Sequence, residues 1–388
     1  MEFCKLKRAF TAHEDEFKSA LLTVATSAAY IKGPEVHELE QALSAYTQTK
    51  HTLSCASGTD ALVLALKSLG IGKGDAVICP SFTFFASAEA ISIVGAKPVF
   101  VDVEEESFNI DPNSVKRALE LFEQQDKYNL KALIAVDLFG RLANYSELKA
   151  LAQAHKLFII EDFAQAFGAQ SENGVAGSFA DAAATSFFPT KPLACFGDGG
   201  AVFCSDDKAY ELMKSLAVHG KGKDKYDNVR IGMNSRLDTL QAAVLLVKLK
   251  HFDEELSNRR AVARAYSVNF EQSEAYKRGL IKLPAKSTDA LIDQNAWAQY
   301  TIKLNNSLMR DALQEQLAKK DIPTMVYYER ALHQMKAYQG GKNCFTPVSL
   351  EVSEKLCATV LSLPFDAYLS QDEIWHLVSS IDEYLCRL

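Results

Sequence analysis

Residues 51–103 read HTLSCASGTDALVLALKSLGIGKGDAVICPSFTFFASAEAISIVGAKPVFVDV, and this stretch decides the fold. Short runs typical of β-strands (HTLSCAS, DAVICP, KPVFVDV) alternate with segments whose apolar residues recur at helical spacing. The alternation continues through LKALIAVDLFG, NYSELKALAQAH and KLFIIED. The strand runs are largely apolar, as in a parallel sheet that is buried on both faces. The sequence therefore predicts an α/β fold, a mostly parallel sheet between helices.

The chain beyond residue 180 first extends this pattern and then departs from it. Residues 182–204 predict two further strands around a turn, and a long helical stretch begins near Leu237. We interpret that helical stretch as the connection between two domains. A large domain with its N-terminal segment would cover residues 1–250, and a small C-terminal α+β domain would cover residues 251–388.

Composition indicates a globular protein that acts on small molecules. The 388 residues are 48% hydrophobic and 23% charged, and the net charge of -7 argues against nucleic acid or an anionic membrane as the partner. The eight cysteines are scattered without zinc-like or disulfide-like spacing, so we expect reduced thiols and no metal site. The N-terminus MEFCKLKRAF lacks the apolar core of a signal peptide, which predicts a cytoplasmic protein.

One lysine stands in an unusual setting. Lys191 lies in TSFFPTKPLACFGDGGA (185–201), on a turn between two prolines with apolar strands on both sides. Burial at a sheet edge would lower the pKa of its ammonium group and make the amine a nucleophile near pH 7. The alternative is a solvated turn lysine, which is the ordinary state of this residue type.

Three further segments follow strands, where a doubly wound sheet places its site. Ser57-Gly58-Thr59-Asp60 opens a helix and predicts either a phosphate seat or a plain N-cap. Asp162 ends KLFIIED and would either hold a cationic ring nitrogen or cap the next turn. Ser186 could add a hydroxyl group to the phosphate seat. Phe82 and Phe84 follow another strand, and each ring would either lie flat against an aromatic cofactor or pack in the core.

These parts are what pyridoxal 5′-phosphate (PLP) requires, and the motif order points to a known family. GTDAL, PSFTF, EDFAQAFGA, SFFPTKPL with GDGGA, and GMNSRLDTLQAA resemble the DegT/DnrJ/StrS family of nucleotide-sugar aminotransferases, of fold type I. The resemblance covers nearly the whole chain. It implies PLP as the cofactor, pyridoxamine 5′-phosphate as its intermediate form, and a homodimer with shared active sites.

The resemblance also implies a role for each matching residue. Lys191 would form the Schiff base with the cofactor and then move the proton, while Asp162 would pair with the pyridine nitrogen. Gln165 would bond the ring's 3′-oxygen, and Phe84 would stack on the ring. The phosphate would be held by Gly58, Thr59, Ser186 and, from the partner subunit, Asn234. Substrate would be bound by Arg236 across the interface and by Tyr328 and His333.

The reaction implied is a transfer of the amino group from L-glutamate, which leaves as 2-oxoglutarate, to a keto-sugar carried on a nucleoside diphosphate. The motifs resemble most the branch acting on UDP-2-acetamido-2-deoxy-3-oxo-glucuronate, in surface-glycan biosynthesis. Departures at Phe163, Arg141 and residues 327–330 leave a dTDP-3-keto-6-deoxyhexose or a 4-keto-6-deoxy sugar as alternatives. The basic loop HGKGKDKYDNVR (219–230) predicts either attraction of the diphosphate or an exposed charge run.

Two other classes remain open beside the aminotransferase. A sugar dehydratase of this fold has histidine in place of the Schiff-base lysine, and Lys191 argues against it. A sugar-binding or regulatory descendant without catalysis would be expected to lose Lys191 or Asp162, and this chain has both.

Overall fold

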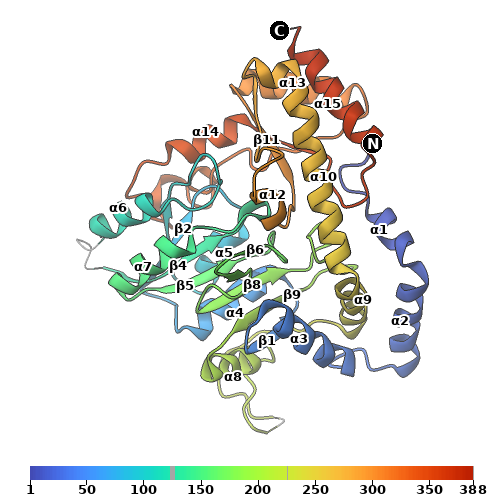
Figure 1. The fold of residues 1–388 in the computed structure, drawn as a ribbon. Helices are drawn as coiled ribbons and strands as arrows, with labels where there is room; N and C mark the ends of the chain where they lie inside the picture. The colour runs from blue at the N-terminus through green and yellow to red at the C-terminus, as the bar shows by residue number, and fades with distance from the viewer. Residues whose placement is uncertain (123–126, 225, 388) are drawn as a thin grey trace.

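The computed structural model describes residues 1–122, 127–224 and 226–387. Within these ranges a seven-stranded sheet has the order β1-β9-β8-β5-β4-β2-β3 (Figure 1). Its strands are β1 (His51–Cys55), β2 (Asp75–Pro80), β3 (Lys97–Val101), β4 (Asn129–Val136), β5 (Phe158–Asp162), β8 (Ala182–Ser186) and β9 (Gly200–Cys204).

The strand directions bring the predicted site segments to one edge of this sheet. β3, β2, β4, β5 and β8 pair in parallel, while β9 is antiparallel to both β8 and β1. Two antiparallel steps restore the direction, so β1 points the same way as β8. The carboxyl ends of β1, β2, β4, β5 and β8 therefore open on the same side, and the predicted fold class, α/β with a mostly parallel sheet, is confirmed.

Helices cover both faces of the sheet, as the alternating pattern predicts. Four of the helices follow directly on strands: α4 (Gly58–Ser68), α5 (Ala86–Ile93), α6 (Pro112–Phe122) and α7 (Tyr145–His155). The helix predicted after residue 111 was expected to include residues 123 and 124, which lie outside the described ranges. α8 (Asp207–Leu216) follows β9 and packs beside α4 and β1.

The N-terminal segment consists of helices that periodicity had not delimited. They are α1 (Leu6–Ala12), α2 (Glu14–Ser27) and α3 (Pro34–Thr47). α2 and α3 both pack against α9 (Thr239–Lys250), and α3 also lies beside β1. The single helical stretch predicted from residue 237 is in fact two helices. His251 leaves the helical conformation (φ −104°, ψ 6°), and α10 (Phe252–Gln272) starts in a new direction after it.

A second sheet lies above the first in Figure 1 and, in the same described ranges, has three antiparallel strands: β10 (Ile281–Lys282), β11 (Tyr300–Leu304) and β12 (Val360–Leu363). Its apolar face packs against α10, α13 (Ser307–Ala318) and α15 (Gln371–Leu385). The remaining short elements are β6 (Gln170–Ser171), β7 (Gly174–Val175), α11 (Glu274–Lys277), α12 (Leu291–Gln294) and α14 (Glu351–Thr359).

The second unit is not one continuous piece of sequence. Ala331, Leu332 and Tyr338 are buried in the core beneath the large sheet, so the chain returns to the first unit before β12 completes the second sheet. The division into a large domain (1–250) and a small domain (251–388) stays a prediction, and α14 in this segment also packs against α13 and β11 of the second unit. None of the helices within the described ranges is long and apolar enough to cross a membrane. All eight cysteines, which lie in those ranges, are unpaired, and six of them are buried.

Two buried acids lie beneath the carboxyl edge of the sheet. Asp137 follows β4 and accepts hydrogen bonds through Oδ1 from Ala143 N (2.8 Å) and the Tyr145 hydroxyl (3.0 Å). Its Oδ2 has no donor among the described residues and interacts with the Glu161 carboxyl group, so one proton must be shared between the two. Burial raises the pKa of Glu161 from 4.5 to about 7, and burial with the Glu161 charge raises the pKa of Asp137.

This pair makes stability depend on pH in a defined direction. Because the pKa values of this pair are raised in the folded state, the pair favours folding at low pH. This contribution to stability is lost as the pH rises from about 4.5 through about 7. Asp137→Asn supplies a permanent N–H for the shared proton. We expect the variant to gain on the order of 1–3 kcal/mol relative to wild type between pH 5 and pH 8.

Urea unfolding of both proteins across this pH range measures the difference. Glu120→Gln, which changes an exposed acid on α6, serves as the control and should show no pH-dependent gain. A constant difference between wild type and Asp137→Asn at every pH would contradict the shared proton.

Candidate active site

The end of β1 and the end of β8 form a narrow cradle. Ser57 caps α4 by accepting a hydrogen bond from Asp60 N at 3.1 Å, so the N-cap prediction is confirmed. The first N–H groups of such a helix, here those of Gly58 and Thr59, have no partner within the helix and attract anions. A Cβ added at Gly58 would lie 2.6 Å from Cβ of Ser186, so only glycine allows this approach. The cradle thus brings the N–H groups at the start of α4 close to the Ser186 hydroxyl.

Lys191 lies on the turn that follows β8. Its backbone N–H donates to Phe188 O at 2.9 Å, and the Ser186 hydroxyl accepts from Phe188 N at 3.3 Å, which fixes the turn against the cradle. The residue is only partly exposed. Desolvation lowers the pKa of the Lys191 ammonium group, and the Asp162 carboxylate opposes this shift by attraction. The amine is therefore closer to its neutral, nucleophilic form than that of a surface lysine.

Asp162 ends β5 and is buried, with 7% of its surface exposed. Burial raises the pKa of its carboxyl group, whereas hydrogen bonding by Ser87 and the charge of Lys191 act against that rise. The Ser87 hydroxyl donates to Oδ2 at 2.8 Å, and Ala164 N donates to Oδ1 at 3.3 Å. These donors aim the carboxylate and leave it acceptor capacity toward the open edge of the sheet.

Gln165 connects the ends of β4 and β5 to the segment that carries Tyr328. Its Oε1 accepts from Phe139 N at 2.7 Å, and its Nε2 donates to the Tyr328 hydroxyl at 3.2 Å. Phe84 stands beside Tyr328, with ring centroids 6.3 Å apart, and exposes 56% of its surface. Phe82 is instead buried, so core packing holds for Phe82 and Phe84 remains available to an aromatic ligand.

His333 is predicted on the substrate side, yet both of its ring nitrogens are engaged within the chain. Nδ1 lies 2.8 Å from the Ser81 hydroxyl, and Nε2 lies 3.0 Å from Glu354 Oε1. The histidine thus ties the end of β2 to α14. Tyr328, by contrast, reaches the group around Asp162 through Gln165.

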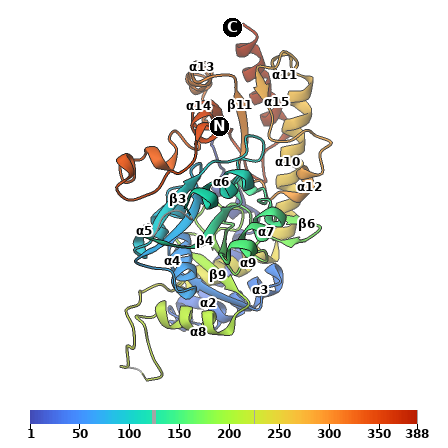
Figure 2. The same cartoon turned by 90° about the vertical axis from the view of Figure 1, so that its left-hand side faces the viewer.

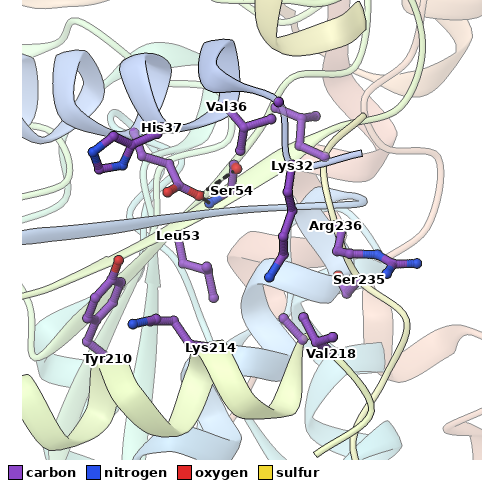
Figure 3. Close-up of a pocket in the computed structure, with 14 residues that line it drawn as sticks. Lys32, Val36, His37, Leu53, Ser54, Tyr210, Lys214, Val218, Ser235 and Arg236 are labelled. Atoms are coloured by element: carbon purple, nitrogen blue, oxygen red, sulfur yellow. Dashed lines mark hydrogen bonds between the residues drawn. The ribbon is translucent and has the colours of Figure 1, made fainter. Parts of the chain in front are cut away.

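Asn234 and Arg236 flank Ser235, whose hydroxyl accepts a hydrogen bond from Ala56 N at the end of β1 (3.2 Å). Asn234 is exposed and bridges to Val218. Arg236 lines a pocket between α3 and α8, together with Lys32 and Lys214 (Figure 3). The loop between α8 and α9 extends from the body of the molecule in both views (Figures 1 and 2). It carries the predicted basic run; one member of that run, Lys225, lies outside the described residues.

Sequence reasoning missed several contributors to the site. Ser87 bonds Asp162 from 75 residues away, and the Tyr328–Gln165 bond joins residues 163 apart, so neither leaves a local pattern. Lys32 precedes a Gly-Pro helix start and shows no motif. His13, Glu16 and His251 also bring possible metal-ligand atoms within 4.8 Å of one another, but Glu16 is already paired with Lys250.

A lysine facing a buried carboxylate at the strand ends of an α/β sheet, beside an anion cradle, defines an enzyme of the aminotransferase class. The chain belongs to the DegT/DnrJ/EryC1/StrS aminotransferase family, whose model matches residues 11–382. It is therefore an aminotransferase, and the enzymes of this family depend on PLP.

Known proteins resemble the chain along its whole length. The UDP-2-acetamido-2-deoxy-3-oxo-D-glucuronate aminotransferase of Pseudomonas aeruginosa is 37% identical over 96% of this chain and 97% of its own. A family member from Brucella abortus has a crystal structure with a TM-score of 0.92 and 41% identity, covering 99% of both chains. The Bacillus subtilis protein NtdA, solved with bound cofactor PMP, has a TM-score of 0.86 and 26% identity, covering 97% of this chain and 82% of that one.

The cradle can be tested through Gly58. Gly58→Ala forces its Cβ against Ser186 and should weaken the binding of PLP to the apoprotein by about tenfold or more. Absorbance and fluorescence titration of the apoprotein with PLP measures the affinity. Gly72→Ala is the matched control, because its Cβ meets nothing closer than 3.5 Å. Equal PLP affinity in Gly58→Ala and wild type would exclude the cradle as the phosphate site.

Proposed function

We propose that this aminotransferase transfers the amino group of L-glutamate to the C3 keto group of a nucleotide-linked sugar. UDP-2-acetamido-2-deoxy-3-oxo-glucuronate is the best candidate, because the Pseudomonas aeruginosa relative is named for it and matches nearly the full chain. The observation that carries the proposal is Lys191, which lies partly buried on its turn, faces the charge of Asp162 and follows the strand that ends at Ser186. The product would supply surface-glycan biosynthesis.

The residues present fit PLP as the cofactor. Gly58, Thr59 and Ser186 would hold its phosphate, and Asp162 would hold its ring nitrogen. When bound, PLP supplies an aldehyde that takes up amines and a ring that accepts electron density from the substrate carbon.

The chain's own side chains supply acid-base chemistry and orientation. The lowered pKa of Lys191 would let its Nζ act as a nucleophile, and the free amine would carry the proton between the carbon of the substrate and the carbon of the cofactor. Ser87 and Lys191 oppose the rise in the pKa of the Asp162 carboxyl group, and its carboxylate would pair with the protonated ring nitrogen of PLP. Gln165 would contact the 3′-oxygen of the ring, and Phe84 would stack on one face of the ring.

The competing functions differ from this one at specific residues. Lys191 disfavours a dehydratase, which requires histidine there, and the burial of Lys191 with Asp162 disfavours a protein that only binds sugars. A dTDP-3-keto-6-deoxyhexose or a 4-keto-6-deoxy nucleotide sugar remains the second candidate substrate. Arg330 and Glu329, which depart from the branch that binds a uronate, favour testing it.

Two observations support a homodimer with shared active sites. The loop between α8 and α9 exposes apolar side chains, with Ile231 at 88% and Val229 at 52% exposure. Such surfaces are typical of contacts with another chain. Asn234 follows this loop and is exposed, as a residue that completes a partner's site would be.

The proposed reaction divides into two measurable halves. L-glutamate should convert the absorbance spectrum of the pyridoxal form to that of the pyridoxamine form, and a panel of UDP- and dTDP-linked 3-keto and 4-keto sugars should reverse this change. We expect the UDP-linked 3-oxo-glucuronate to react fastest. Lys191→Ala should lose both halves, while Lys116→Ala, an exposed lysine on α6, should retain them. Conversion by Lys191→Ala at the wild-type rate would refute the nucleophile, and sole reactivity of 4-keto sugars would refute C3.

The shared site predicts complementation between inactive variants. Lys191→Ala mixed with Arg236→Ala should regain about a quarter of wild-type activity, since half of the dimers are hybrids and each hybrid has one intact site. Lys191→Ala mixed with Asp162→Ala should regain none, because both residues belong to one subunit's half of the site. Absence of recovery with Arg236→Ala, when subunit exchange has been demonstrated, would rule out a role across the interface.

A further inference from the structure

The loop that carries Lys191 leaves β8 and returns as β9. At its base, Phe187 N donates to Gly199 O at 2.8 Å, and Cys195 N donates to Phe187 O at 2.8 Å. Two prolines stiffen the turn around Lys191, because each fixes its own φ angle. Within the described ranges no hydrogen bond holds the Lys191 side chain, on which only burial and the charge of Asp162 act. The position of the amine therefore depends on the course of the loop backbone.

The limb of this loop that leads into β9 contacts the first turn of α9. Gln241 Oε1 accepts a hydrogen bond from Phe196 N at 2.8 Å. A Cβ added at Gly197 would lie 3.3 Å from Nε2 of Gln241, so the amide group lies close along the loop backbone. Leu237, four residues before Gln241, approaches the same limb, since a Cβ added at Gly199 would lie 2.8 Å from its Cδ1. The start of α9 thus supports the limb from beneath.

The Phe196 ring gives the loop a second contact, with the N-terminal helices. Its centroid lies 4.9 Å from that of Phe17, which is fully buried, and 5.9 Å from that of Phe10. α2, which carries Phe17, packs in turn against α9 (Figure 1). Apolar contacts are not directional and tolerate small displacements, whereas the hydrogen bond to Gln241 joins one N–H to one acceptor. The hydrogen bond is therefore the contact that restricts the limb most narrowly.

We propose that Gln241 is a positioning residue for Lys191. By accepting from Phe196 N it holds the limb that leads into β9, and through the stiffened turn it keeps the Lys191 amine facing the Asp162 carboxylate. The inference rests on the role of Lys191 proposed above and adds a residue that acts on it from α9. Because 45 residues separate Gln241 from Phe196, no local pattern announces this contact.

Gln241→Met tests the hydrogen bond, because it removes the acceptor but keeps the side-chain length and a good helix former in α9. We expect the half-reaction with L-glutamate to slow by about tenfold with little change in KM, since a displaced reacting group slows the step without weakening substrate binding. The pH midpoint of the absorbance change of the PLP-loaded protein should also shift, because the amine moves relative to Asp162. Gln241→Glu, which keeps an acceptor oxygen, should restore the rate. Gln153→Met, at an exposed glutamine on α7, is the matched control.

Hydrogen exchange measured by mass spectrometry tests the contact without reference to activity. With and without PLP, residues 192–199 should exchange faster in Gln241→Met than in wild type, while α13 should exchange equally in both. The proposal is overturned if residues 192–199 exchange equally in the two proteins, or if the pH midpoint does not move. It is also overturned if Gln241→Glu is as slow as Gln241→Met, because the side chain would then act through its shape alone.

Borohydride reduction followed by peptide mapping separates this inference from the proposed function. Reduced cofactor on a lysine other than Lys191 would refute the proposed role of Lys191, whereas faster exchange of residues 192–199 in Gln241→Met would still support the hold of Gln241 on the loop. If Lys191 is labelled and Gln241→Met matches wild type in rate, spectrum and exchange, the role of Gln241 alone fails.

Discussion

The removal of water from charged groups at the carboxyl edge of the sheet is the constraint on which the rest of the structure depends. Desolvation is the first cause of the raised pKa values of Asp137, Glu161 and Asp162 and of the lowered pKa of Lys191. Buried ionisable groups are tolerated only with specific partners. Each acid accordingly has its own donors, such as the Ser87 hydroxyl for Asp162 at 2.8 Å. A backbone hydrogen bond from Asp137 N to Asp162 O at 3.0 Å holds the end of β4 against β5.

Loss of hydration acts on two lysines whose charged neighbours differ in sign. Lys191 and Lys32 both have a lowered pKa because of burial. Lys191 faces a carboxylate, which keeps its amine in place for reaction with a carbonyl group. The strongest charged neighbour of Lys32 is Arg236, which lowers the pKa of Lys32 further, while Glu40 opposes that shift. The sign of the neighbouring charge therefore distinguishes the surroundings of the two lysines.

The parts of the structure that follow from local pattern were predictable from sequence. The strands of the large sheet, the helices between them and the positions of Gly58, Asp162 and Lys191 at strand ends all follow from periodicity and turn residues. Phe163, expected to turn into the core, is fully buried against Phe203. Contacts that join distant segments were not predictable. The bonds of Ser87 to Asp162 and of His333 to Ser81 depend on how elements pack, and no single-sequence pattern encodes packing.

The edge strand β1 links the Gly58–Ser186 cradle to the segment that carries Arg236. An unpaired strand edge is a liability for a sheet and is usually covered or charged. Here α3 and α8 flank it, and the segment carrying Arg236 is tied to its end, because Ala56 N donates to the Ser235 hydroxyl at 3.2 Å. The next residues in the chain, Ser57 and Gly58, form the cradle beside Lys191. The end of β1 thus positions both the cradle of its own subunit and Arg236. A shift of this strand end would therefore move both groups.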